Sequence, residues 1–532
     1  MEGEGTMKHL IGVTCALLAA LSLGGGNDAR AQDAARTLRV GVQADLKIVD
    51  PVFTTARVTG NFANAVYETL FAFDADGKPQ PQMVGDYKVS EDALTYEFTL
   101  RPGIKWHDGS PVRAADVVAS LKRWMRRAPI GAQLASFTST LEPVDERSFR
   151  LVLKERYGLV LPALAKRSPG SPVIMPERLA RTPPNEPVQE VMGSGPFMFK
   201  ASEWQPGNRV VFERFKDYVP RSEPASGMAG GRIVKVDRMV WSYIPDNNTG
   251  LAALQAGEID YLDEVPFDFF PLLKDDRNIK LVDVNSGNPG IIRPNHLQPP
   301  FNNPKARQAL IYLVDQKEYM QAAVGDPTLY DAFCGAYFIC GSENATEAGS
   351  EPFRKRDIAK ARQLLAEAGY KGEPIVLLQP TDRPLYNAWV MVLIQNLRDA
   401  GVKVDPQASD WSAITSRREK KEPPSQGGWN LFVTGAPPTG TDPASSPYFT
   451  PACDKANTGW PCDPDMLKMI DQWSREPDEA KRHALIDEIQ KRAYETVPFV
   501  ILGQYRQPVA VRSNVMGVLK SESNVFWNIE KK

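Results

Sequence analysis

The sequence is poor in histidine and cysteine, the residues that most often build metal centres and nucleophilic sites. Its 532 residues include 4 histidines and 5 cysteines. Beyond the N-terminal leader the histidines are His107, His296 and His483, and none has a partner at metal-ligand spacing. We therefore expect no metal site and no cofactor, because an isolated histidine in a loop or helix is usually structural.

Net charge and recognisable catalytic motifs are also missing. The chain has 63 Lys and Arg against 65 Asp and Glu, a net charge of −2, which argues against nucleic acid as a partner. It has no P-loop and no G-x-G-x-x-G, and Met192–Pro196 (M-G-S-G-P) does not satisfy G-x-S-x-G. Nothing positive indicates an enzyme, and a secreted hydrolase with an unrecognised site is kept as the alternative from another class.

The N-terminus has the pattern of a cleavable signal peptide. Lys8 and His9 precede an apolar run from Leu10 to Leu23, and an A-x-A site ends at Ala31. The run is short for a membrane span, and no later stretch is long and apolar enough to be one. We expect export, with cleavage near Ala31 and with the start codon left open between Met1 and Met7.

Four cysteines remain after the leader, and an even number in an exported protein indicates disulfides. Three pairings are possible. We favour the local pairs Cys334–Cys340 and Cys453–Cys462, because each brackets a short loop rich in turn residues. Zinc is the alternative, which the lack of a C-x-x-C motif and of a nearby histidine disfavours.

Proline is the one residue in surplus. Proline makes up 44 of the 532 residues, a larger share than the usual value of about 5%. This proline content excludes a long-helix or coiled-coil protein. Alternation of apolar and polar residues predicts strands at Thr37–Val42, Leu94–Leu100, Phe149–Leu153 and Arg209–Phe215. Helical spacing predicts helices at Asn303–Tyr319, Asp357–Gly369, Asn387–Ala400 and Asp478–Glu495, with a strand at Val402–Val404. Alternating strands and helices in the second half indicate an α/β protein with a parallel sheet.

A series of short motifs runs along most of the chain. The densest, within Tyr67–Trp124, contains L-R-P-G-I-K-W-H-D-G-S-P-V-R-A-A-D-V. The others, in order, are G-S-G-P-F (193–197), L-Q-A-G-E-I-D (254–260), P-P-F-N-N-P-K-A-R-Q-A-L (299–310), I-A-K-A-R-Q-L-L-A-E-A-G-Y (358–370) and V-P-F-V (497–500). In this combination the chain resembles the large periplasmic solute-binding proteins of ABC importers, in the peptide, opine and nickel-binding group called family 5. The motifs consist of turns and helix starts, so they indicate the fold and not the ligand.

The resemblance implies an α/β, two-lobed, type II-like periplasmic-binding-protein fold with an extra subdomain inserted in lobe I. The expected parts are 1–31 (signal peptide), 32–75 (lobe I), 76–190 (inserted subdomain), 191–284 (lobe I), 285–502 (lobe II) and 503–532 (return to lobe I). It further implies a periplasmic monomer that binds a small solute or short peptide without chemistry. The lobes would close by hinge motion, and a membrane permease would be the partner.

The resemblance also suggests ligand contacts at two places in lobe II. Asp382–Tyr386 (D-R-P-L-Y) matches the segment in which Arg383 would hold a ligand carboxylate. Asp442-Pro443 keeps the family's acid-proline dipeptide, but Thr439 stands where peptide-binding members carry the acid that holds the ligand ammonium. No acid lies between residues 434 and 441, which argues against the classical mode of peptide binding unless Asp442 takes over that role.

Further contacts are expected around these places. Trp411 and Trp429 could form aromatic walls of such a cleft, although a core position is slightly favoured for Trp429. The remaining candidates follow the first strand or approach lobe II. The residues are Trp411, Trp429, Phe53, Thr54, Thr55 and Asn295. The expected solute is a peptide or peptide-like carboxylate, with an opine, a metallophore or a glycoside as alternatives.

Overall fold

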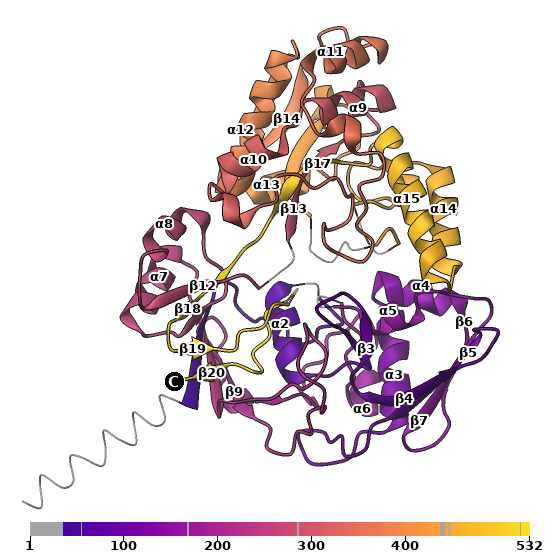
Figure 1. Ribbon diagram of the computed structural model, residues 1–532, viewed down its shortest axis with the longest axis vertical. Helices are drawn as coiled ribbons and strands as arrows, with labels where there is room; N and C mark the ends of the chain where they lie inside the picture. Colours follow the sequence, from indigo (N-terminus) through magenta and orange to yellow (C-terminus); the bar gives the residue numbers. More distant parts are fainter. Residues whose placement is uncertain are drawn as a thin grey trace, which may run out of the picture.

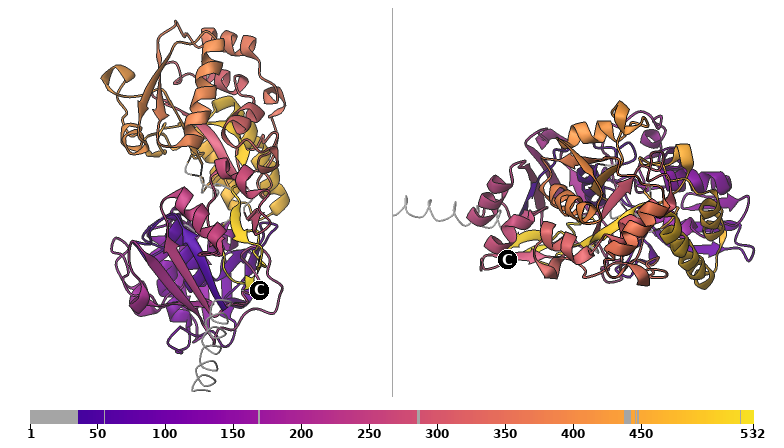
Figure 2. Two further views of the ribbon diagram at one scale, coloured as in Figure 1. Left: turned by 90° about the vertical axis from the view of Figure 1, so that its left-hand side faces the viewer. Right: turned by 90° about the horizontal axis from the view of Figure 1, so that it is seen from above.

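The computed structural model describes residues 36–54, 56–167, 170–284, 287–436, 442–444, 446, 448–521 and 523–532. The predicted signal peptide and the candidate residues Thr55 and Thr439 lie outside these ranges. The chain forms two lobes, one above the other, joined along one side (Figures 1 and 2). Within the described ranges, no helix has the length and apolar character needed to cross a membrane.

Lobe I is built on a seven-stranded sheet with the order β12-β18-β11-β1-β10-β9-β8. Its strands are β1 (Thr37–Val42), β8 (Phe197–Phe199), β9 (Arg209–Arg214), β10 (Arg238–Tyr243), β11 (Tyr261–Leu262), β12 (Ile279–Val282) and β18 (Val509–Arg512). β1 is parallel to β10 and β11, and the other pairings are antiparallel. Helix α2 (Arg57–Val66) packs on one face through Phe62, whereas α7 (Asn247–Ala256) and α8 (Phe270–Leu273) pack on the other. A short pair, β19 (Val515–Met516) and β20 (Glu530–Lys531), follows.

A second, antiparallel sheet lies within the segment expected to be the inserted subdomain. Its order is β4-β5-β7-β6, and it packs against several helices (Figure 1, lower right). The elements are β2 (Phe71–Phe73), β3 (Pro79–Pro81), β4 (Val84–Val89), β5 (Thr95–Leu100), α3 (Ala114–Met125), α4 (Pro129–Phe137), β6 (Thr138–Pro143), β7 (Ser148–Leu153), α5 (Val160–Leu164) and α6 (Glu177–Ala180). Alternate residues of β5 and β7 are buried, as the apolar-polar alternation predicts.

Two of the sequence motifs meet in this lobe and are structural. The ring of His107 lies against the G-S-G-P segment, with Nε2 3.0 Å from the carbonyl oxygen of Gly195, and its backbone N–H donates to the carbonyl of Gly193 at 2.9 Å. A Cβ at position 193 would lie 1.9 Å from the carbonyl oxygen of Val66, so only glycine fits. Burial lowers the pKa of His107 to about 4, which keeps the imidazole neutral at neutral pH.

Lobe II is built on a five-stranded sheet with the order β15-β14-β16-β13-β17. Its strands are β13 (Asn288–Pro294), β14 (Ile375–Pro380), β15 (Val404–Ser409), β16 (Leu431–Gly435) and β17 (Val500–Tyr505). The predicted parallel arrangement is confirmed for β14, β15 and β16 but is wrong for β13, which enters from lobe I and pairs antiparallel with both β16 and β17. The helices are α9 (Pro304–Tyr312), α10 (Gln316–Ala323), α11 (Ile358–Glu367), α12 (Pro384–Asp399), α13 (Trp411–Arg417), α14 (Pro464–Arg475) and α15 (Glu479–Thr496).

The single helix predicted over Asn303–Tyr319 is two helices. The first ends at Tyr312, and the second begins at Gln316 after Asp315, whose side chain accepts a hydrogen bond from the backbone N–H of Lys317 at 3.1 Å. The helical spacing of apolar residues continued through the break because Leu313 and Val314 are buried there too. Asp315 is a typical residue at a helix start and indicated the break, but the continuous apolar spacing favoured a single helix.

Both predicted disulfides are confirmed. Cys334 bonds to Cys340, and Cys453 bonds to Cys462. Among the described residues, no group of histidine, cysteine, aspartate or glutamate side chains is arranged to hold a metal ion.

The chain crosses between the lobes twice, side by side, from β12 to β13 and from β17 to β18 (Figure 1, left). β17 carries the lobe II sheet as far as Tyr505, slightly past the expected boundary at 502. Arg506 follows directly and forms ion pairs with Asp331 of lobe II at 2.7 Å and with Asp283 of the other crossing at 3.5 Å. Two adjacent connections of this kind permit rotation of one lobe against the other.

The lobes also touch on the side opposite the crossings. The backbone N–H of Gly158, just before α5, donates to the carbonyl oxygen of Ser474 in α14 at 2.8 Å. Arg475 of α14 forms an ion pair with Glu155, and its guanidinium lies 4.8 Å from the centre of the Phe137 ring. Contacts therefore join the lobes at the crossings and on the opposite side of the cleft.

Candidate ligand-binding site

Both lobes turn the carboxyl ends of their parallel strands toward the cleft. In lobe II, β13 starts at the crossing and pairs antiparallel with β16, with Gly290 opposite Gly435, so β16 and the parallel strands β14 and β15 all end beside lobe I. In lobe I, β18 starts at the other crossing, with Ala510 opposite Leu262, so β11 and the parallel strands β1 and β10 end beside lobe II. Such edges are where α/β proteins place ligands.

Arg383 and Trp411 lie together at the lobe II edge. Arg383 precedes α12, is exposed, and its guanidinium makes no hydrogen bond or ion pair with any residue in the described ranges. Trp411 begins α13, and its backbone N–H donates to the side chain of Asp382 at 2.8 Å. The loops after β14 and β15 are thereby tied to each other.

A row of aromatic rings connects this edge to lobe I. The ring of Tyr386 lies 5.0 Å from Trp411 and 5.7 Å from Trp389, measured between ring centres. Trp389 lies 5.9 Å from Tyr505, which lies 5.5 Å from Phe267 of lobe I. The sequence analysis did not assign Tyr386 or Tyr505 to the site, although Tyr386 stands in the same D-R-P-L-Y segment as Arg383.

The lobe I edge carries three charged side chains that the sequence analysis missed. Arg57, the first residue of α2, pairs with Glu264, and 57% of its side chain is exposed. Asp263, just after β11, is 8% exposed, and burial raises its pKa to about 6 although the Arg57 charge opposes this. No motif marks these residues. The available signal was a pair of acids directly after a short strand of a parallel sheet.

The cleft continues away from the crossings as a cavity of about 430 Å³ lined by both lobes. Lobe I contributes Phe73, Lys166 and Arg167, and lobe II contributes Asp442 and Arg482. Burial lowers the pKa of Lys166, and the carboxylate of Asp442 acts against that shift. The structure therefore brings the predicted residue Asp442 to the cleft, facing a lysine of the other lobe.

Two of the predicted contact residues lie in the core of lobe II in this structure. Trp429 is fully buried, packs on Phe432 and Trp460, and donates from Nε1 to the carbonyl oxygen of Arg418 at 2.9 Å. Asn295 is also fully buried, and its amide donates to the carbonyl oxygen of Trp429 at 3.0 Å. Both side chains hold the core of lobe II together and cannot reach the cleft in this structure.

The segment after β1 lies at the lobe I edge, although its described side chains are engaged locally. The guanidinium of Arg127 lies 4.9 Å from the centre of the Phe53 ring. Thr54 accepts a hydrogen bond from the backbone N–H of Ala56 at 3.2 Å, just before α2 begins. The roles predicted for Phe53 and Thr54 remain predictions.

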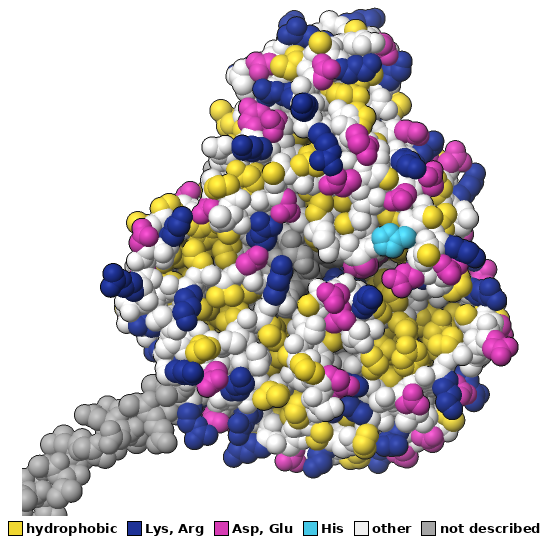
Figure 3. Space-filling view, viewed as in Figure 1, with side chains coloured by type: hydrophobic (Ala, Val, Ile, Leu, Met, Phe, Trp, Pro, Cys, Tyr) yellow, Lys and Arg dark blue, Asp and Glu magenta, His cyan; other side chains and the backbone are white. Residues whose placement is uncertain are grey.

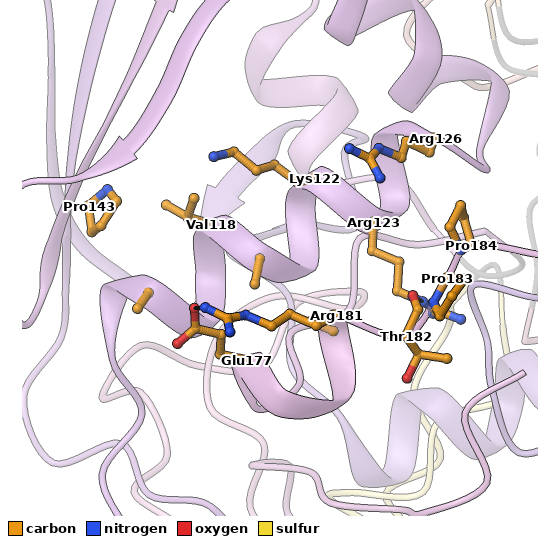
Figure 4. A pocket seen from close by; sticks show the side chains of 13 residues that line it. Val118, Lys122, Arg123, Arg126, Pro143, Glu177, Arg181, Thr182, Pro183 and Pro184 are labelled. Atoms are coloured by element: carbon orange, nitrogen blue, oxygen red, sulfur yellow. Dashed lines mark hydrogen bonds and ion pairs between the residues drawn. The ribbon is translucent and has the colours of Figure 1, made fainter. Parts of the chain in front are cut away.

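A separate hollow of about 410 Å³ lies between α3 and α6 on lobe I (Figure 4). Lys122, Arg126 and Arg181 surround it, and Arg181 pairs with Glu177 at 2.7 Å. No residue of lobe II lines this hollow, so it is not part of the cleft.

Comparison with known proteins agrees with this arrangement. The profile of the family described as bacterial extracellular solute-binding proteins, family 5 (Middle), matches residues 78–458. The chain belongs to this family. The solute-binding role and the two-lobed α/β fold expected from the motifs are thereby confirmed.

Family 5 relatives match along almost the whole chain. A probable peptide ABC transporter periplasmic-binding protein of Sinorhizobium fredii is 39% identical over 510 residues, 93% of each chain. A glutathione-binding protein of Pectobacterium atrosepticum is 28% identical over 505 residues, again 93% of each. The solved structure of the PBP AgaA of A. tumefaciens R10 with agropinic acid is 26% identical, with a TM-score of 0.75 over 93% of this chain and 99% of the other.

Proposed function

We propose that the protein captures a carboxylate-bearing solute, a peptide or a peptide-like acid, between its lobes and delivers it to the permease of an ABC importer in the periplasm. The observation that carries this proposal is Arg383. Its guanidinium is exposed at the carboxyl edge of the lobe II strands and is unpaired within the described part of the chain. A free arginine at that position is suited to a ligand anion.

The chemistry of Arg383 favours a carboxylate. A guanidinium can donate two parallel hydrogen bonds to the two oxygens of one carboxylate, and such charge-assisted bonds are stronger than neutral ones. Closure of the lobes removes water and strengthens the interaction further. Tyr386 and Trp411 beside it offer flat apolar surface to the rest of the solute.

The relatives support this class of ligand. They are described as binding proteins for peptides, glutathione and agropinic acid, all of which carry carboxylates. An opine-like acid is the second candidate, favoured by the agropinic acid complex and by the lack of an acid between residues 434 and 441.

Binding by closure requires no bond making. A solute that contacts both lobes stabilises the closed form. Its apparent Kd equals the Kd for the closed form divided by the fraction of molecules that are closed without ligand. On the face shown in Figure 3, positive and negative side chains are mixed over both lobes, so the solute is selected by a few side chains and not by bulk charge. We expect a monomer that is exported by its signal peptide and has no catalytic activity.

A thermal-shift panel tests the proposal. Dipeptides, tripeptides, glutathione and opine acids are compared with their C-amidated forms, and the tightest binder is measured by calorimetry. A ligand at 100 times its Kd adds about 2.7 kcal/mol of stability. Incubation of the panel with the protein, followed by mass spectrometry, should show no turnover products.

Substitution of the arginine makes the test specific. Arg383→Gln should weaken the carboxylate ligand roughly 10- to 100-fold, because a hydrogen bond to a charged group contributes about 1.5–3 kcal/mol. It should have little effect on the C-amidated form. Arg398→Gln, at the exposed far end of the same helix, is the matched control and should bind as wild type. Unchanged affinity in Arg383→Gln would refute the carboxylate assignment.

A further inference from the structure

The lobe I edge contains a buried carboxylate oxygen that lacks a hydrogen-bond partner in the described part of the chain. Asp263 is 8% exposed, and its Oδ1 has no hydrogen-bond partner among the described residues. Leaving a buried acceptor unpaired is unfavourable, and such atoms in folded proteins call for an explanation. Its position just after β11 places this atom at the edge that faces lobe II.

The direction of the Asp263 side chain follows from the strand before it. Tyr261 lies in the core beneath α2 together with Phe62, whereas Leu262 lies in the core on the opposite face. Side chains alternate along a strand, so Asp263 is on the α2 side, where that helix begins at Arg57. Burial lowers the pKa of Arg57, but the carboxylates of Glu264 and Asp263 both act on it and raise it overall, as expected for three neighbouring groups.

The charges at this place do not balance. Arg57 is already paired with Glu264. Asp263 therefore adds a second negative charge, which Arg57 and a hydrogen bond from the backbone of Gln43 only partly offset, because burial still raises the pKa of this carboxyl. A cation supplied by the solute would complete the cluster, because a buried charge is stabilised by a partner that is itself hydrogen-bonded.

We propose that Asp263 receives a primary ammonium group of the solute. This inference rests on the proposed function and narrows the ligand class to zwitterions, with a free amino group held by lobe I and a carboxylate held by Arg383 of lobe II. Each lobe then binds one end of the same molecule. Neither lobe alone satisfies the solute, so binding is coupled to closure.

The experiment uses the full mature chain and the tightest-binding peptide of the panel in three forms: free, N-acetylated and C-amidated. Affinities are measured by calorimetry at pH 7.5 for wild type and for the variants Asp263→Asn, Asp263→Glu, Asp442→Asn, Arg383→Gln and Asp268→Asn. Asp268 is exposed, lies close by in lobe I, and serves as the matched control. We expect wild type and Asp268→Asn to prefer the free over the N-acetylated peptide by at least tenfold, and Asp263→Asn to lose that preference.

Several results would overturn the inference. One is that wild type binds both forms equally, and another is that Asp263→Asn keeps the wild-type preference. A third is that the preference is lost in Asp442→Asn instead. Loss of discrimination against the C-amidated form in Arg383→Gln tests the proposed function separately, so a failure of either assignment can be recognised without the other. Asp263→Glu, which keeps the charge, should retain the preference in part.

Discussion

Gly158 offers a direct test of lobe closure, because its contact with lobe II leaves no room for a side chain. A Cβ at this position would lie 2.2 Å from the carbonyl oxygen of Glu476, whereas real Cβ contacts are essentially never shorter than 3.0 Å. In Gly158→Ala the lobes must separate by roughly an ångström. That shift would stretch the 2.8 Å hydrogen bond from Gly158 to Ser474 and weaken the neighbouring Arg475–Glu155 pair.

The expected magnitude follows from the cost of overpacking. An extra methyl group in a close-packed contact costs about 1–3 kcal/mol. The cost applies only to the closed form, so it raises the apparent Kd of the ligand. Because 1.4 kcal/mol corresponds to a tenfold change in Kd, the apparent Kd should rise roughly 5- to 150-fold. Stability without ligand should change little, since residue 158 is not in the packed interior of either lobe.

Calorimetry with the tightest panel ligand measures the affinity, and small-angle X-ray scattering measures compaction when the ligand is added. Gly109→Ala is the control. It places a side chain at a positive φ of 88° but meets no atom within 4 Å, so it should cost stability and not affinity. Wild-type affinity in Gly158→Ala, with the same ligand-induced compaction, would refute the idea that this contact closes the cleft.

Two further predictions concern buried charges in lobe I. Asp50→Asn should destabilise the protein by about 3–5 kcal/mol in urea unfolding, because it leaves the fully buried guanidinium of Arg123, now 2.6 Å from Asp50, without its counter-charge; a loss under about 1 kcal/mol would contradict this. Burial raises the pKa of Asp263 from 3.8 to about 6, so the folded state favours the protonated carboxyl group. The free energy of unfolding that protonated Asp263 contributes is therefore fully present below pH 4 and is lost as pH rises through 6. Asp263→Asn should therefore be up to about 3 kcal/mol more stable than wild type at pH 7.5, at about 1.4 kcal/mol per pKa unit, with a smaller difference at pH 4.5; an equal difference at the two pH values would count against the raised pKa.

The sequence predicted the scaffold better than the site. Turn and capping chemistry is local, so strands such as Thr37–Val42 and helices such as Asp478–Glu495 are confirmed. The break at Asp315 was missed because the apolar period continued across it. The mixed direction of the lobe II sheet was missed because β13 takes its direction from the hinge, which helical and strand periodicity do not encode.

At the site, the sequence could place a residue where its position depends on the neighbouring residues in the chain, but not where it depends on segments far away in the sequence. Arg383 and Trp411 lie at the lobe II edge, as their positions after predicted strands indicate, and their contacts with a ligand remain predictions. The burial of Trp429 and Asn295 could not be predicted, because the packing of Trp429 against Trp460 and the hydrogen bond from Asn295 to Trp429 form only when distant segments pack. Asp263 was missed because its meaning depends on Arg57, which is more than 200 positions earlier in the chain.

The place of β18 in the lobe I sheet has a consequence for the order in which that sheet can form. β18 lies between β12 and β11, so these two strands cannot be joined into one sheet until residues 509–512 are available to pair with both. Lobe II, by contrast, is one continuous stretch from β13 to β17. A chain crossing the membrane from its N-terminus would present the first strands of lobe I earliest but could not seal their edge until last. The edges of β11 and β12 would then be open to pairing with other chains until β18 is in place, and β18 is the strand that protects them.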